Sequence, residues 1–131
     1  MTALIDDLLL ALRIFRTAKA MGITSVLGVS QADAASLPAR QADEIVLLGP
    51  APSAQSYLAI DRVVAAARDA RCDAVHPGYG FLSENADFAR AVLAAGMIFA
   101  GPDITTLEAM GDKLAARRIA VEAGLPVLPG G

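Results

Sequence analysis

Short apolar runs and longer amphipathic stripes alternate along the chain. The runs are bounded by glycine, proline or polar positions, a pattern that predicts strands. The predicted strands cover residues 2–5, 24–29, 45–48, 74–76 and 97–99. The pairs Gly49-Pro50 and Gly101-Pro102 directly follow the third and fifth runs and are expected to end them.

Between most of these runs, apolar residues recur every three or four positions, which predicts helices with one apolar face. The stripes are Leu8, Leu12, Phe15 and Ala18; Ile60, Val63, Val64 and Ala67; and Phe88, Ala91, Val92 and Ala95. Asp6 or Asp7 is expected to cap the first helix. Gly22 and Gly96 are expected to end the first and third, and the second is expected to end near Arg71.

The C-terminal part of the chain predicts two further helices. Thr105 and Glu108 have the spacing of a capping box, which predicts a short helix at this point. Asp112 is expected to cap the next helix, over residues 113–123, and Gly124 to end it.

This order of elements predicts one α/β domain with an open parallel sheet and helices on both faces. A chain of 131 residues is long enough for one packed core. Right-handed crossovers would bring the loops that follow the strands together along one edge. These loops are residues 6–7, 30–40, 49–56, 77–85 and 101–105.

Composition and charge exclude several classes of protein. The net charge is −3 and basic residues are interspersed with acidic ones, which argues against a nucleic-acid partner. The single cysteine, Cys72, permits no internal disulfide and is interpreted as a buried thiol of an intracellular protein. The apolar run 8–12 is too short to cross a membrane, and no cleaved signal is found. We therefore expect a soluble, cytoplasmic protein.

The most polar of the strand-end loops follows the fourth predicted strand. The only histidine, His76, ends that strand, and the loop contains Gly78, Tyr79, Gly80 and Glu84. In one interpretation the glycines let the backbone amides approach a small polar ligand, with the tyrosine ring as a flat wall. In the other it is a satisfied turn, with the histidine bonded to the backbone and the glutamate solvated at a helix start. The loop alone leaves both open, and either Ser83 or Asn85 can cap the following helix.

A second candidate is the lysine of the sequence Gly111-Asp112-Lys113. A lysine beside a glycine at a helix start can reach a phosphate, and it can equally be a solvated surface residue. Neither G-x-x-x-x-G-K-[ST] nor G-x-G-x-x-G occurs in the chain.

Four segments resemble the N-terminal domain of biotin carboxylases, the ATP-dependent component of acetyl-CoA, propionyl-CoA, methylcrotonyl-CoA and pyruvate carboxylases. They are HPGYGFLSEN at 76–85, MGDK at 110–113, GPAPSAQSY at 49–57 and ADE at 42–44. The resemblance covers nearly the whole chain, and the first segment is long enough to be far more specific than a short glycine motif.

The resemblance implies that residues 1–131 form a Rossmann-like, pre-ATP-grasp domain, and that the ATP-grasp and C-terminal domains of the family are absent from this chain. In the family these domains together carboxylate biotin, using bicarbonate and MgATP. The implied partners are the remaining carboxylase domains, the biotin carboxyl carrier domain and a second copy, since Arg16 matches a position at the family's dimer contact. The isolated chain is expected to be inactive.

The resemblance also implies roles for individual residues. Lys113 matches a lysine that contacts ATP, and Tyr79 with Gly80 match residues that line the biotin site. His76, Gly78 and Glu84 belong to the same loop and are expected to shape it. No catalytic residue and no metal ligand is assigned to this chain.

The chain departs from the family pattern at two places on the predicted ligand-facing edge. The family has an N-R-G-E turn where this chain has Asp-Asp-Leu-Leu at 6–9, and it has a histidine at the position of Pro38 and an acidic residue near Ala35. These changes suggest an alternative, a non-catalytic divergent or engineered domain that self-associates through exposed residues such as Leu9. A stand-alone nucleotide binder is disfavoured because the phosphate-binding glycines are missing.

Overall fold

The sheet is parallel throughout, as predicted. The computed structural model describes residues 1–5 and 11–127. Within these residues one sheet has the strand order β3-β2-β1-β4-β5, and every neighbouring pair of strands is parallel. The strands are β1 (Thr2–Ile5), β2 (Thr24–Ser30), β3 (Glu44–Gly49), β4 (Ala74–His76) and β5 (Ile98–Phe99). The chain therefore builds outward from β1 to one edge and then crosses over to continue on the other side.

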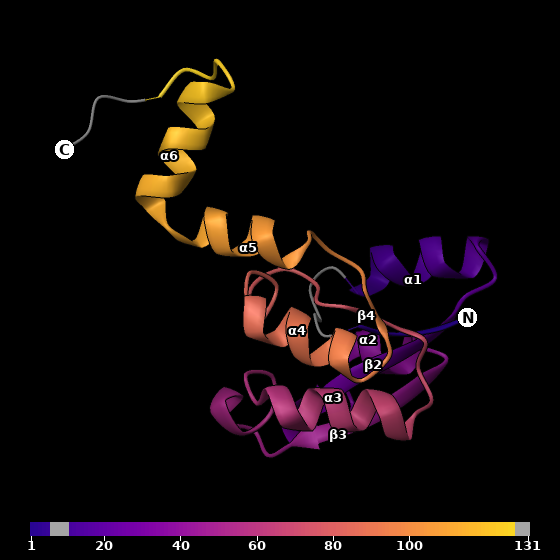
Figure 1. Ribbon diagram of the computed structural model, residues 1–131. Coiled ribbons are helices and arrows are strands. Elements are labelled where there is room, and N and C mark those ends of the chain that lie inside the picture. Colours follow the sequence, from indigo (N-terminus) through magenta and orange to yellow (C-terminus); the bar gives the residue numbers. More distant parts are fainter. Residues whose placement is uncertain (6–10, 128–131) are drawn as a thin grey trace.

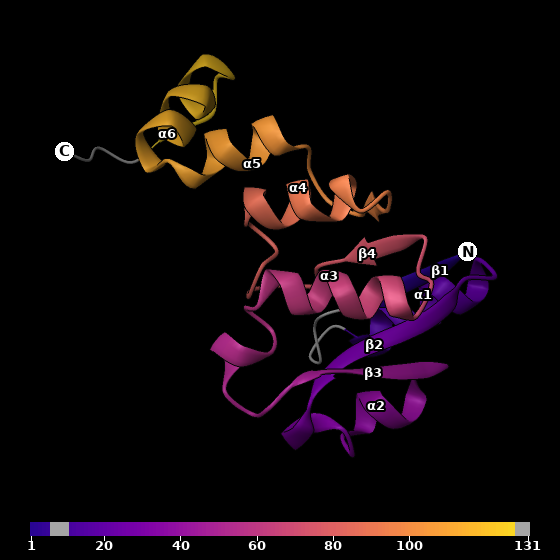
Figure 2. The same ribbon diagram turned by 60° about the horizontal axis from the view of Figure 1, so that its bottom comes forward.

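Helices cover both faces of this sheet, and the predicted fold class is confirmed (Figure 1). The helices are α1 (Ala11–Ala20), α2 (Leu37–Gln41), α3 (Ile60–Asp69), α4 (Ala86–Ala94), α5 (Ile104–Gly111) and α6 (Lys113–Glu122), with short 3₁₀ turns η1 (Gln31–Asp33) and η2 (Ser53–Gln55). Figure 2 shows α2 and α3 on opposite sides of β2 and β3. The expected capping residues Asp6 and Asp7, and Leu8 of the first stripe, lie outside the described residues.

Two apolar clusters fill the space between the sheet and the helices. On one face Leu4, Val26 and Val75 of the strands pack with residues of α3 and α4, among them Phe88. On the other face, residues of β2 pack with residues of α1 and α2, among them the buried Phe15. Because β2 contributes to both clusters, its residues from 25 to 30 are all buried.

The sequence between β2 and β3 contains a helix that we did not predict. We expected a loop over 30–40, whereas the structure places η1 and α2 there. The Ser36 hydroxyl caps α2 by accepting from the Ala39 N–H at 3.4 Å. Pro38 lies in the first turn, where its missing N–H removes no intrahelical bond. Five residues are too few to show an apolar stripe, so the pattern could not reveal this helix.

The capping box predicted at Thr105 and Glu108 is wrong. The cap of α5 is Asp103, whose Oδ1 accepts from the Thr106 N–H at 2.7 Å. This hydrogen bond holds the pKa of Asp103 below its usual range. Glu108 instead pairs with Arg90 of α4. A carboxylate directly before the helix is a strong acceptor for the first N–H groups, and this leaves Glu108 available for the neighbouring helix.

Two other predicted caps are settled by the structure. Asp112 caps α6, its Oδ1 accepting from the Leu114 N–H at 2.8 Å. Of the two candidates before α4, Asn85 is the cap, and its Oδ1 accepts from the Phe88 N–H at 2.9 Å.

The Asn85 cap provides a first test of these assignments. We expect Asn85→Ala to lower the free energy of unfolding by about 1 kcal/mol, because an N–H at the start of α4 loses its partner. Ser83→Ala, which changes the other candidate, is the matched control and should be close to neutral. Urea denaturation followed by circular dichroism measures both. Equal losses in the two variants would contradict the assignment.

Candidate functional site

The polar loop identified in the sequence follows β4 at the point where the strand order reverses direction. β4 pairs with β1 on one side and β5 on the other, with His76 beside Ile5 in the register. In open α/β sheets, ligands bind at the carboxyl ends of the strands at such a switch point. Residues 77–85, here called the 77–85 loop, are thus at the position where this fold binds ligands. The loop after β1 lies outside the described residues.

The backbone of the 77–85 loop is fixed by its own hydrogen bonds. The Gly78 N–H donates to Nδ1 of His76 at 3.0 Å, so a neutral ring carries its proton on Nε2. The Ser83 N–H donates to the carbonyl of Gly80 at 2.8 Å. Gly78 and Gly80 have φ values of +70° and +81°, as their glycine identity predicts. The histidine thus bonds to the backbone, as the satisfied-turn interpretation expected, and the turn is rigid.

The same turn presents an exposed surface. Tyr79 is 78% exposed. Gly80 is exposed too, and a Cβ at this position would meet no atom within 4 Å. Gly80 is therefore required for its backbone conformation rather than for space, and a ligand can approach its backbone. The two interpretations of the loop are compatible, since an ordered turn holds Tyr79 and Gly80 toward solvent.

The 77–85 loop is anchored by a contact between two aromatic rings that we had not singled out. Phe81 stacks on Tyr57, with 4.8 Å between ring centroids and 17° between planes. Tyr57 follows β3 and is only 4% exposed. Its hydroxyl donates to Oδ2 of Asp33 at 2.6 Å and accepts from the Ser30 N–H at 3.0 Å. The Ser30 hydroxyl also donates to Oδ2 of Asp33, at 2.8 Å. We call Ser30, Asp33, Tyr57 and Phe81 the Tyr57 cluster.

The Tyr57 cluster could not be found from sequence spacing. Tyr57 and Phe81 were both within segments that resemble biotin carboxylases, but the stack joins residues that are far apart in the chain. One available signal was a tyrosine in a short polar loop, since a buried phenol requires a hydrogen-bond partner.

The hydroxyl of Tyr57 has a measurable pH signature. Burial, followed by the hydrogen bond to Asp33, raises the pKa of Tyr57 to about 12. An unfolded tyrosine titrates at about 10, so this group's contribution to stability is complete below about pH 10 and is lost as the pH rises through about 12. In an ultraviolet titration of tyrosinate, we expect Tyr57→Phe to remove a step near pH 12. A variant that retains this step would contradict the assignment.

The lysine segment lies beside the 77–85 loop. Ser83 and Glu84 of the loop line a cavity of about 270 Å³ together with Met110 and Gly111 at the end of α5. Lys113 is exposed in the first turn of α6, two residues beyond that cavity. The structure thus brings together the HPGYGFLSEN and MGDK segments, with Tyr79 and Gly80 exposed on the same loop.

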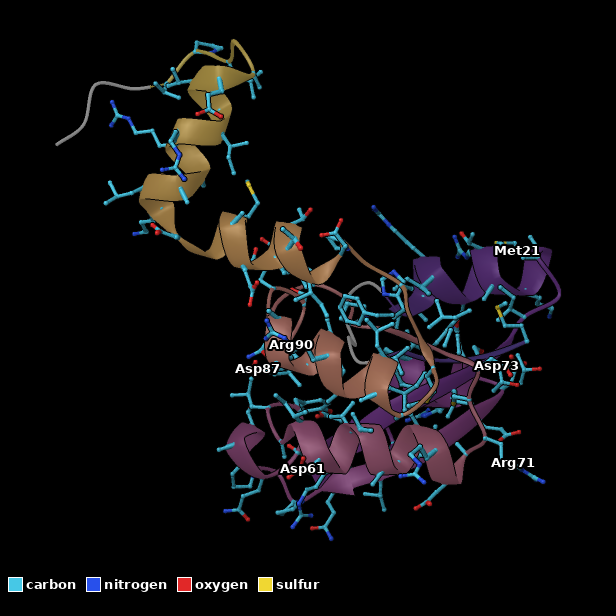
Figure 3. The ribbon with its side chains drawn as sticks, viewed as in Figure 1. Met21, Asp61, Arg71, Asp73, Asp87 and Arg90 are labelled. Carbon is cyan, nitrogen blue, oxygen red and sulfur yellow. The ribbon has the colours of Figure 1, made fainter. Side chains whose placement is uncertain are left out.

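His76 is part of the wall of a larger, mostly apolar groove. It has a volume of about 510 Å³ and lies between α1 and the part of the sheet formed by β1, β4 and β5. Its walls include Ala3, Ile14, Ile98 and Met21, the last at the C-terminal end of α1 (Figure 3). We call this the α1 groove. Among the described residues, α1 and α2 pack mainly against β2 on this face, and the groove lies beside that contact.

Most of the other candidate positions lie within the described residues. Arg16 is exposed on α1. The carbonyl of Ala35 accepts from Nε of Arg40 at 3.1 Å. The segment 6–9 lies outside the described residues. Cys72 is buried, as expected, and burial with two nearby carboxylates raises its pKa to about 11.

Residues 1–5 and 11–127 show neither a metal-binding cluster nor a membrane-spanning helix. In this part of the chain, no group of three or more His, Cys, Asp or Glu side chains is placed to hold a metal ion. No helix among these residues is sufficiently long and apolar to cross a bilayer.

The parallel α/β sheet, with an ordered glycine-containing loop at its switch point, places the chain in the Rossmann-like class of folds. Within that class, residues 7–107 match the family described as biotin carboxylase, N-terminal domain. The chain belongs to this family, as its motifs indicated.

Curated relatives are similar in sequence to most of this chain. The propionyl-CoA carboxylase alpha chain of Ruegeria pomeroyi is 50% identical over 92% of this chain, which spans 18% of that protein. The biotin carboxylase of Halalkalibacterium halodurans is 49% identical over 92% of this chain, which spans 27% of that protein. This chain therefore spans well under a third of the length of these relatives.

Solved structures show the same fold. The biotin carboxylase domain of a single-chain bacterial carboxylase superimposes with a TM-score of 0.91 at 46% identity, over 99% of this chain and 30% of that one. The Kluyveromyces lactis urea amidolyase gives a TM-score of 0.92 at 40% identity, over 98% of this chain and 8% of that one.

Proposed function

We propose that this chain supplies one wall of the ATP and biotin site of a biotin carboxylase, in which bicarbonate carboxylates biotin at the expense of ATP. The observation that carries the proposal is the position of the 77–85 loop, which is ordered at the switch point and lies beside the MGDK segment. No residue of this chain is assigned a catalytic role, and we expect the chain to be inactive without the other domains.

The described residues fit the two ligands. The exposed ring of Tyr79 offers an apolar surface for biotin, and the open backbone at Gly80 allows close approach. Lys113 is exposed at the start of α6, where its ammonium group can reach a phosphate. ATP would supply the phosphoryl group that activates bicarbonate. His76, Gly78 and Glu84 would hold the loop in shape.

The partners in this proposal are the ATP-grasp and C-terminal domains, the biotin carboxyl carrier domain and a second copy that contacts Arg16. The α1 groove and the exposed apolar residues of the C-terminal segment, Leu114, Val121 and Leu125, are the surfaces we assign to the other carboxylase domains. A cytoplasmic location stays a prediction from the sequence.

The test is a chimera. In the Halalkalibacterium halodurans biotin carboxylase, the matched segment would be replaced by this chain, and biotin-dependent ATP hydrolysis would be measured. We expect the chimera to be active and the isolated 131-residue chain to be inactive. Biotin-dependent turnover by the isolated chain would overturn the proposal, and so would a chimera that folds with a normal melting curve and has no activity.

Substitutions in the chimera test which residue contacts which ligand. Tyr79→Ala should raise the KM for biotin roughly tenfold without changing that for ATP, because it removes a wall of the biotin site. Lys113→Gln should raise the KM for ATP instead. Lys19→Gln, on the exposed part of α1, is the matched control and should change neither. Equal effects of the two lysine changes would contradict the role of Lys113.

The alternative, a non-catalytic domain that self-associates, is favoured by one observation, the mostly apolar lining of the α1 groove. Sedimentation of the 131-residue chain tests it. A monomer at high concentration would exclude self-association. A dimer that is lost on Ile14→Asp and kept on Arg16→Ala would support it, because the proposed function places the second copy at Arg16 instead.

A further inference from the structure

The Tyr57 cluster links three strand-end loops in a row. Ser30 is the last residue of β2 and Asp33 lies in the loop after it, Tyr57 follows β3, and Phe81 belongs to the loop after β4. The first three share hydrogen bonds, and the stack of Phe81 on Tyr57 is the step that reaches the 77–85 loop. The cluster is therefore a continuous path from the end of β2 to the residues beside Tyr79 and Gly80.

Tyr57 has little freedom to move. Its ring is buried, and its hydroxyl is held from two sides, by the Asp33 carboxylate as acceptor and the Ser30 N–H as donor. A hydrogen bond from a hydroxyl to a carboxylate is short and strong, as the 2.6 Å distance here illustrates. The ring of Tyr57 is thus a fixed platform.

Phe81 requires such a platform. Its φ is +42°, a left-handed conformation that is uncommon for a bulky residue. A non-glycine residue in this region costs on the order of 1–3 kcal/mol, so it persists only where its surroundings hold it. The stack on Tyr57 provides that support, and Leu82, the next residue, is buried in the core. The loop is consequently fixed immediately after Gly80.

We propose that Tyr57 and Asp33 are positioning residues for the biotin wall, and that they set the placement of Tyr79 and Gly80 through the stack on Phe81. This inference rests on the proposed function. It adds two residues that would contact neither biotin nor ATP. They act by holding the turn in the conformation in which Tyr79 faces outward.

The variants that test it separate the hydrogen bonds from the ring. Tyr57→Phe retains a ring for stacking and removes the bond to Asp33, and Asp33→Asn weakens the same bond from its other end. Ser25→Ala is the matched control. Ser25 is also buried on β2, and its N–H and hydroxyl donate to Oδ2 of Asp43 at 2.8 and 2.7 Å, at the opposite end of the strand.

In the chimera, we expect Tyr57→Phe and Asp33→Asn to raise the KM for biotin about tenfold while the KM for ATP and kcat stay unchanged. Ser25→Ala should leave the KM for biotin unchanged even if it lowers the melting temperature. If Tyr57 and Asp33 only stabilised the fold, the three variants would have similar KM values for biotin. Biotin KM values that are unchanged in the two cluster variants, or raised equally in the control, would overturn the proposal.

Amide hydrogen exchange of the 131-residue chain separates this proposal from the proposed function, because it requires no activity. Tyr57→Phe should speed exchange of the Gly78 and Ser83 N–H groups about tenfold, while that of Phe88 in α4 stays unchanged. Unchanged exchange in the loop would overturn the positioning role. An inactive chimera with faster loop exchange would place the failure in the proposed function alone.

Discussion

Replacing Phe88 with alanine should lower the free energy of unfolding by about 3–5 kcal/mol, the largest single effect we expect. Phe88 is fully buried between α4 and the sheet. Its ring meets that of Phe99 edge-on, with 5.9 Å between centroids and 88° between planes. Truncation removes this contact and leaves a cavity that the surrounding strands cannot close. Urea denaturation of the 131-residue chain, followed by circular dichroism, measures the loss.

The matched control for Phe88→Ala is on the same helix. Leu93 is 49% exposed, so Leu93→Ala removes little buried surface and should cost less than about 1 kcal/mol. If the two substitutions cost the same, α4 does not pack on the sheet through the face described here.

Replacing Gly49 with alanine is expected to cost about 3 kcal/mol, since it adds overpacking to backbone strain. Gly49 ends β3 with φ of +155°. A Cβ on this residue would lie 2.2 Å from the backbone oxygen of Gln55, which cannot move without shifting η2. Because Tyr57 lies two residues after Gln55, a shift of η2 should also disturb the surroundings of its hydroxyl and move the pKa of Tyr57 from about 12 toward its ordinary value.

Gly111→Ala is the control for this second prediction. Gly111 is the last residue of α5, and a Cβ there would meet nothing within 4 Å. Alanine should therefore be neutral or slightly stabilising at this position. Denaturation of both variants distinguishes a specific clash from a general intolerance of substitution, and a Gly49→Ala protein as stable as Gly111→Ala would refute the clash.

The parts of the fold that depend on local pattern could be predicted from the sequence. The five strands and the long helices follow from apolar spacing, and Phe15, Val63 and Phe88 are buried as their stripes indicated. The strand order could not be obtained in this way, because pairing of β1 with both β2 and β4 depends on contacts between distant parts of the chain. Competition between nearby caps explains the error at α5, where Asp103 takes the position assigned to Thr105.

The same distinction between local pattern and contacts of distant residues applies to the candidate site. The 77–85 loop and the lysine segment were found because each is continuous in sequence. Their proximity across one cavity, and the stack of Phe81 on Tyr57, became visible only in three dimensions. The stack of the exposed Phe81 ring on the buried Tyr57 ring leaves no periodic signal in the sequence, since the two residues belong to different loops.

The position of α6 has a consequence for Lys113. This helix extends away from the sheet, and none of its ten residues is buried (Figure 1). A helix shorter than about 12–15 residues is marginal in water on its own, so α6 depends on its Asp112 cap and its junction with α5. Its local unfolding free energy should be the lowest among the helices described above. We therefore expect Lys113 to lie on the least stable of these helices, and its distance from the 77–85 loop to change when another domain binds α6.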